Sequence, residues 1–449
     1  MPHALLILFA FAFGACVGSF LNVVVWRLPR VEHPEADRSL LGPIWRTLGA
    51  LSHPPSHCPN CNHPIRWYDN LPVIGWLKLG GRCRDCRAPI SARYPVVEAV
   101  VGGLFVLTYA MFFLLGHAPC SPDGLGLMVD RGYYAAMPLD PRTDWPVYGL
   151  AVFTVACLLA ASLIDAELFI IPIEIPWLMA AVGVAYHAAT ASPTTPGALL
   201  YGPTVSAMGL GAVVGLAVSI ALQQRGLLKR SFPDGEPMLE IDRKLLAEDV
   251  ARDLAEARKR GEDMATYKPS LPPVPPEYTR VGVAMEVRKE MAFLLPPMLL
   301  AVGFGTLATT GPLAGWWADV AARDWVGGAC GALFGACVGA VVVWVFRIFG
   351  SLAFGRVAMG LGDVHLMFGV GAVVGAGPAT VAFFLAPFFA LAVSVWRLLT
   401  RGSRELPFGP YLALATCFLL FFYCPLAVKL APGLQGLAIV VRNAVAGGG

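Results

Sequence analysis

The chain has 449 residues, of which 57% are hydrophobic and only 14% are charged, whereas an ordinary soluble domain has about 25% charged residues. The mean hydropathy is +0.64 and the formal net charge is only +3, so the composition excludes a disordered chain, a coiled coil, a collagen and a nucleic-acid-binding domain. It predicts an all-α polytopic membrane protein, whose partner is the lipid bilayer and not a nucleic acid.

A helix that crosses a membrane needs about 20 mostly apolar residues. Nine runs meet or approach this length and a tenth is shorter, so we expect nine or ten transmembrane helices. The first run is too long for an ordinary signal peptide and has no lysine or arginine before it, so we expect it to stay as the first helix. The runs are 5–26, 96–115, 147–164, 175–189, 205–222, 292–309, 327–349, 364–376 (the short one), 379–396 and 411–428.

Lysine and arginine are divided unevenly between the two sets of loops that ten spans would create. The set that holds 27–93, 225–289, 347–356 and 397–404 contains 28 of the 33 basic residues. Because cytoplasmic loops carry an excess of lysine and arginine, we expect this set to lie in the cytoplasm and both termini to lie outside.

Four of the 11 cysteines form two Cys-x-x-Cys pairs, Cys58 with Cys61 and Cys83 with Cys86, with 21 residues between the pairs. Two such pairs supply the four thiolates that close a tetrahedral Zn²⁺ site. A cytoplasmic loop is reducing, which argues against two disulfides. Since all four ligand positions are taken by protein, none is left for an activated water, and the spacing predicts a structural zinc.

Two aspartates stand out because acidic residues in or beside a span are costly and therefore functional candidates. Asp165 ends the third predicted span, Asp363 comes just before the short run, and the topology places both at cytoplasmic helix ends. Two carboxylates at close range cannot both ionise easily, so one can keep a proton while the other activates a water. Gly360 and Gly362 would let the backbone bend before the helix. From the residues alone, ion transport and helix capping remain alternatives.

These features divide the chain into five parts. Residues 1–26 form the first transmembrane helix, 27–95 a cytoplasmic zinc-binding domain, 96–222 the transmembrane helices that carry Asp165, 223–290 a charged cytoplasmic insertion, and 291–449 the transmembrane helices that carry the Gly-Leu-Gly-Asp motif. Within the insertion, 239–260 predicts an amphipathic surface helix and 269–276 an extended proline-rich tether. A solvated loop without chemistry is the plainer interpretation of the insertion.

The order of the motifs resembles that of the type IV prepilin peptidases, membrane aspartyl proteases with a Gly-x-Gly-Asp motif. The similar segments fall in family order between residues 14 and 415, namely 18–29 (GSFLNVVVWRLP), 81–91 (GRCRDCRAPIS), 93–98 (RYPVVE), 164–165, 360–364 (GLGDV) and 407–411 (PFGPY). The chain departs from the family at Glu167, where an aspartate is usual, and at His365, where a lysine is usual. The insertion and the two helices around it look additional to the family's eight-span plan.

The resemblance implies an enzyme of the bacterial cytoplasmic (inner) membrane that cleaves the leader peptide of type IV pilin-like or type II secretion pseudopilin precursors at the cytoplasmic face. Asp165 and Asp363 correspond to its catalytic pair and the four cysteines to its zinc ligands. Many members also N-methylate the new N-terminus with S-adenosylmethionine, for which no binding residues are identified here. Glu98, Glu167 and Glu174 are candidates for contacts to the basic leader.

Two other classes of function fit the same residues. A proton- or cation-coupled transporter would use Asp165 and Asp363 to carry charge through the membrane. A non-catalytic scaffold of a secretion machine would use the cysteine domain for docking. Replacing each aspartate by asparagine separates the three classes. The replacement would stop cleavage by a peptidase and ion flux through a transporter, and it would not change the function of a scaffold.

Overall fold

The structure is a computed structural model that describes residues 3–31, 42–52, 56–116, 139–190, 199, 202–232, 247–248, 250–252, 254–255, 258, 279–400, 407–422 and 426. Within these residues the chain is helical, and β-pairing is confined to two isolated bridges. The helices are α1 (His3–Arg27), the 3-10 turn η1 (Leu28–Arg30), α2 (Gly42–Ser52), α3 (Ile74–Lys78), α4 (Arg93–Tyr109), the π-turn η2 (Ala110–Leu114), α5 (Trp145–Leu168), α6 (Glu174–Thr190), α7 (Pro203–Gln224), α9 (Arg280–Thr310), α10 (Ala314–Ala321), α11 (Asp324–Phe354), α12 (Leu361–Val374), α13 (Ala376–Thr400) and a last helix, Gly409–Phe422.

Every predicted apolar run corresponds to a helix in the described part of the chain. Seven helices there are long and apolar enough to cross a membrane, and α12 and the last helix are shorter apolar helices. Large apolar side chains such as Phe9, Leu299 and Phe388 are more than half exposed, as expected where lipid replaces water as the solvent. The all-α, multi-pass membrane class is therefore confirmed.

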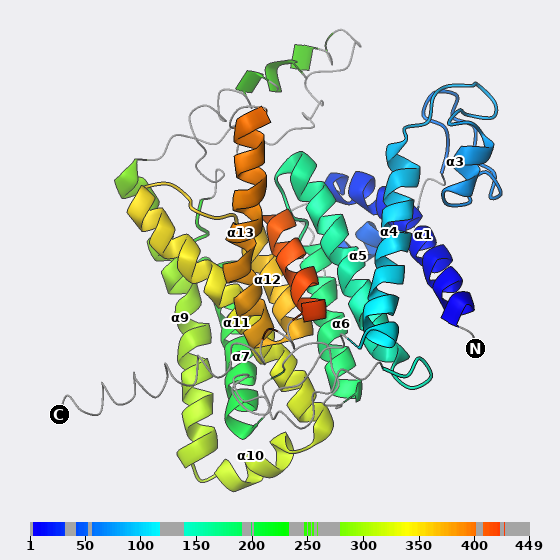
Figure 1. The fold of residues 1–449 in the computed structure, drawn as a ribbon. Coiled ribbons are helices and arrows are strands. Elements are labelled where there is room, and N and C mark those ends of the chain that lie inside the picture. The colour runs from blue at the N-terminus through cyan, green and yellow to red at the C-terminus, as the bar shows by residue number, and fades with distance from the viewer. Residues whose placement is uncertain are drawn as a thin grey trace.

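One large hydrophobic core unites α1, α4, α5, α6, α12, α13 and the last helix, with side chains such as Phe105, Leu158, Leu366 and Leu412 at its centre. Figure 1 shows α7 and α9 to one side of this bundle, next to α11, and the segment around α3 at the end of the bundle where α4 begins. A smaller core joins α9 to α11. The helices around the predicted insertion are thus packed onto the bundle through α11.

Glycines allow the central helices to approach closely. A Cβ on Gly183 of α6 would lie 2.8 Å from the carbonyl oxygen of Ala372 on α12, and a Cβ on Gly209 of α7 would lie 2.6 Å from that of Cys330 on α11. Both distances are shorter than a carbon–oxygen contact allows, so only glycine fits. Such small-residue contacts are how membrane helices pack when the hydrophobic effect no longer drives them together.

Two details differ from the sequence expectation. Arg347, counted there with a cytoplasmic loop, lies inside α11 and is 1% exposed; it is buried because an acidic partner neutralises it, as described below. The helix α9 begins at Arg280, before the predicted apolar run. Its first turns are stabilised because they pack in the smaller core between α9 and α11. Most of the predicted amphipathic helix and the whole proline-rich tether lie outside the described residues.

Candidate functional site

The four predicted metal ligands come together. The sulfur atoms of Cys58, Cys61, Cys83 and Cys86 all lie within 4.8 Å of one another, and those of Cys58 and Cys86 are 3.7 Å apart. Zinc–sulfur bonds of about 2.3 Å in a tetrahedron place the sulfurs about 3.8 Å apart. The donor set and its spacing therefore fit a Zn²⁺ ion.

The two cysteine pairs adopt the same local structure. In each, the residue after the second cysteine, Asn62 or Arg87, has a positive φ and donates its backbone N–H to the carbonyl of the first cysteine. Hydrogen bonds from the backbone at Ala88 and from the Asn60 side chain lower the pKa of Cys86 to about 6. A thiolate is the form that binds a metal ion, so groups from both cysteine pairs favour Cys86 as a ligand, whereas the pKa of the neighbouring Cys61 is raised.

Two carboxylates hold this cysteine domain in place. Asp69 accepts two hydrogen bonds from the guanidinium of Arg84, at 2.6 and 2.5 Å, which ties the segment between the pairs to the second pair. Glu98, in the first turns of α4, accepts the backbone N–H of Val73 at 2.6 Å. Val73 has a φ of +60°. Glu98 therefore attaches a conformationally constrained turn of the cysteine domain to α4, the helix that follows the domain in the chain.

Asp165 is buried in the last turn of α5. Its Oδ2 accepts the backbone N–H of Gly409, at the start of the last helix, at 3.0 Å. The helix ends at Leu168, and the next residue, Phe169, adopts the left-handed conformation. A short link then leads to α6, so that Asp165 stands where two membrane helices and their connection meet.

Asp363 is buried in the first turn of α12, behind the glycines of its motif. A Cβ on Gly362 would lie 3.1 Å from Cβ of Ile171, in the link between α5 and α6. A Cβ on Gly409 would lie 3.0 Å from Cδ1 of the same Ile171 and 2.6 Å from Oδ2 of Asp165. Ile171 thus packs against both glycine-containing segments, and it brings the surroundings of the two aspartates together.

The other two acidic candidates lie at helix ends. Glu167 forms a 2.5 Å ion pair with Arg93, and both side chains are about half exposed. This pair joins the end of α5 to the start of α4, so the cysteine domain and Asp165 are at the same end of the bundle. Glu174 is half-buried in the first turn of α6, where a carboxylate is favoured by the helix dipole.

Sequence reasoning missed the residues that position the aspartates. Gly409 lies in a motif that the sequence comparison noted without assigning it a role. Its backbone N–H binds the carboxylate of Asp165, and no pattern of side chains indicates such a contact. Ile171 looks like any apolar linker residue. The buried pair Arg347 and Glu290 had one available signal, a single arginine inside the otherwise apolar end of α11.

Known proteins are similar to part of this chain. Residues 12–112 match the family model of the bacterial peptidase A24 N-terminal domain. A prepilin leader peptidase/N-methyltransferase of Myxococcus xanthus is 45% identical over 97 residues, 22% of this chain and 24% of the relative. A type 4 prepilin-like proteins leader peptide-processing enzyme of Escherichia coli is 45% identical over 136 residues, 29% of this chain and 48% of the relative. No solved structure matches the chain.

The chain spans between a quarter and half of the length of these two relatives. The matched family model covers the part of α1 from residue 12 on, both cysteine pairs and α4, the parts that build the candidate metal centre and its support. The similarity of part of the chain to the prepilin leader peptidases is confirmed.

Proposed function

We propose that this protein is an aspartyl endopeptidase of the membrane that removes the leader peptide from type IV pilin-like or type II secretion pseudopilin precursors. The observation that carries the proposal is the pair of buried aspartates, Asp165 and Asp363, whose glycine-containing neighbours both pack on Ile171. The names of the relatives, which describe prepilin leader processing, support the class of substrate.

Two neighbouring carboxyl groups suit the hydrolysis of a peptide bond. One carboxylate takes a proton from a water, and the other, still protonated, donates its proton as the peptide carbonyl is attacked. The Gly409 N–H holds Oδ2 of Asp165 and so fixes the orientation of that carboxyl group. The backbone at Gly360 and Gly362 brings Asp363 to the very start of its helix.

The proposed cleavage face is cytoplasmic, in the bacterial inner membrane. The set of loops that the predicted topology assigns to one side holds 28 of the 33 lysines and arginines, which is the pattern of cytoplasmic loops. The ion pair between Arg93 and Glu167 links the cysteine domain to the end of α5, so the proposed catalytic pair belongs to this same end. Glu98, Glu167 and Glu174 stay our candidates for contacts to a basic leader, with Glu98 also serving the domain that it holds.

The cysteine domain would hold a structural zinc, which ties its two turns together and needs no redox chemistry. We extend the proposal to N-methylation of the new N-terminus, because the Myxococcus relative carries this activity in its name. S-adenosylmethionine would supply the methyl group. Among the described residues there is no strand–loop–helix nucleotide motif, so no methyl-donor residues are assigned.

The test uses the purified protein and a pilin-like precursor, with mass analysis of the product's N-terminus to report cleavage and methylation together. Asp165→Asn and Asp363→Asn should each lower the cleavage rate by about 100-fold or more. Asp319→Asn is the matched control, because this exposed aspartate lies on α10 at the opposite end of the bundle (Figure 1). Normal cleavage by either of the first two variants would refute the catalytic pair.

A further inference from the structure

The most deeply buried charge outside the proposed catalytic pair is Arg347 of α11. It is 1% exposed and heads the large side chains that are fully buried in the described part of the chain. Burying a guanidinium is costly unless its N–H groups and its charge are matched by partners. The partners of Arg347 therefore show what the arginine is for.

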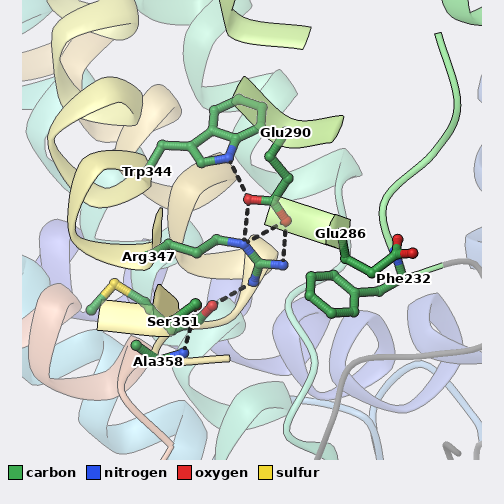
Figure 2. Close-up of polar contacts among 8 residues, drawn as sticks. Phe232, Glu286, Glu290, Trp344, Arg347, Ser351 and Ala358 are labelled. Carbon is green, nitrogen blue, oxygen red and sulfur yellow. Dashed lines mark hydrogen bonds and ion pairs between the residues drawn. The ribbon is translucent and has the colours of Figure 1, made fainter. Parts of the chain in front are cut away.

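The charge is matched by Glu290 of α9. Figure 2 shows the two side chains facing each other: Nε of Arg347 lies 3.1 and 3.0 Å from the two carboxylate oxygens, and Nη2 lies 2.8 Å from Oε1. Trp344, one turn earlier on α11, donates its indole N–H to Oε2 at 2.9 Å. The carboxylate is thus held in one orientation by two side chains, through two nitrogens of Arg347 and the indole of Trp344.

The remaining nitrogen of Arg347 points to the segment that carries the aspartate motif. Nη1 donates to the backbone carbonyl of Met359 at 2.5 Å, and one residue earlier the N–H of Ala358 donates to the Ser351 hydroxyl at 3.1 Å. The contact between Ala358 and Ser351 is visible in Figure 2. Met359 immediately precedes Gly360, the N-cap of α12. The turn into the aspartate helix is therefore tied to α11 at two successive residues.

The same network meets both ends of the insertion, residues 223–290. Phe232, near its start, donates its backbone N–H to Glu286 of α9 at 2.8 Å, and its ring centroid lies 5.7 Å from the guanidinium carbon of Arg347. Glu286 is one turn before Glu290, in the part of α9 with which the insertion ends. A chain of packed groups thus runs from the root of the insertion to the residue before Gly360.

We propose that Arg347 and Glu290 are positioning residues for Asp363. Glu290 fixes the guanidinium, the guanidinium fixes the Met359 carbonyl, and this carbonyl sets where the first turn of α12 begins. The inference rests on the proposed function, in which Asp363 acts in peptide cleavage. If the ion pair served stability alone, Arg347 would need its contact to Glu290 but not its hydrogen bond to the backbone carbonyl of Met359.

The decisive variant is the double replacement Glu290→Met with Arg347→Met. Exchanging both members of a buried ion pair for apolar residues of similar size often leaves stability unchanged or improves it, but here it also removes the donor to Met359. Arg347→Lys is the second variant, since an ammonium keeps the charge but cannot serve the carboxylate and the carbonyl in the forked geometry. Ser219→Ala is the matched control, because it removes a buried hydrogen bond to Phe293 of α9 that does not touch the motif segment.

Two measurements are made on each purified full-length variant. In precursor cleavage we expect kcat to fall about 10- to 100-fold with an unchanged KM for the double variant, because a displacement of about 1 Å at the reacting group costs this much. A smaller fall is expected for Arg347→Lys and none for Ser219→Ala. In hydrogen–deuterium exchange we expect faster exchange confined to residues 355–363.

The exchange measurement keeps this inference separate from the proposed function. If the wild-type protein does not cleave the precursor, the proposed function fails, and faster local exchange in the double variant still supports the positioning of the segment. Wild-type kcat together with wild-type exchange in the double variant would overturn the inference. So would an increase in exchange spread over the whole bundle, because that is the signature of a purely structural ion pair.

Discussion

Gly409 offers a sharp test of whether the orientation of Asp165 matters, because a single methyl group can disturb it. In Gly409→Ala the new Cβ would stand 2.6 Å from Oδ2 of Asp165 and 3.0 Å from Cδ1 of Ile171, whereas ordinary contact begins at 3.4 Å. The carboxylate must therefore retreat by about 0.8 Å, which also stretches its hydrogen bond from the Gly409 N–H.

We expect this variant to lose activity and keep its fold. Overpacking costs about 1–3 kcal/mol, which lowers the stability of the protein without unfolding it. A shift of about 1 Å in a reacting group lowers the rate by about 100-fold. The predicted result is a kcat for precursor cleavage that is about 100-fold lower, with the thermal midpoint only a few degrees lower.

The control is Gly149→Ala, on the same helix as Asp165, where a Cβ meets nothing within 4 Å. It adds the same methyl group to α5 without touching the aspartate, and its cleavage rate should equal that of the wild type. If Gly409→Ala also cleaves at the wild-type rate, the position of the Asp165 carboxylate does not limit the reaction, and its proposed catalytic role is wrong.

Three further predictions concern the cysteine domain. Replacing Cys58 and Cys61 together by serine should abolish zinc binding, measured as metal content after purification, and should expose this domain to proteolysis; unchanged zinc content would contradict the ligand assignment. Glu98→Ala leaves a backbone N–H of the domain without its acceptor, which costs about 1–3 kcal/mol of stability in a thermal unfolding assay; a raised KM with unchanged stability would instead indicate a contact to the leader. Arg84 lowers the pKa of Asp69 through their hydrogen bonds, so the wild type should be more stable than Asp69→Asn at pH 7. This difference in stability should vanish as the pH falls through the lowered pKa of Asp69. A difference that does not change with pH would show that the charge of Asp69 does not stabilise the domain.

The helices were predictable because a membrane span must satisfy its own backbone hydrogen bonds and be apolar along its length. Apolar length alone therefore located α5 and α11. The start of α9 was not predictable in this way, because its first turns contain Glu286 and Glu290. Phe232 and Lys289 bind the carboxylate of Glu286 and Arg347 binds that of Glu290, and of these partners Phe232 and Arg347 are distant in sequence.

The same distinction between local and distant partners separates the site residues. The cysteine pairs were predictable because the turn that presents each pair is made by a few consecutive residues. Glu98 was recognised only as an acidic residue at a helix start, which suits a leader contact as well as any other role. The partner of Glu98 is the backbone N–H of Val73. No property of the Val73 side chain indicates that the backbone of Val73 adopts a positive φ.

Arg347 shows what the pattern of charges in the sequence leaves out. Counting it among the cytoplasmic basic residues treats it as solvated, whereas the arginine is buried and its charge is matched from α9. Removing one partner of such a pair costs about 3–5 kcal/mol, because the other charge stays buried. A version of this chain without α7 and α9 would therefore have to change Arg347 as well. The two additional helices are for this reason part of the structure that holds the aspartate motif.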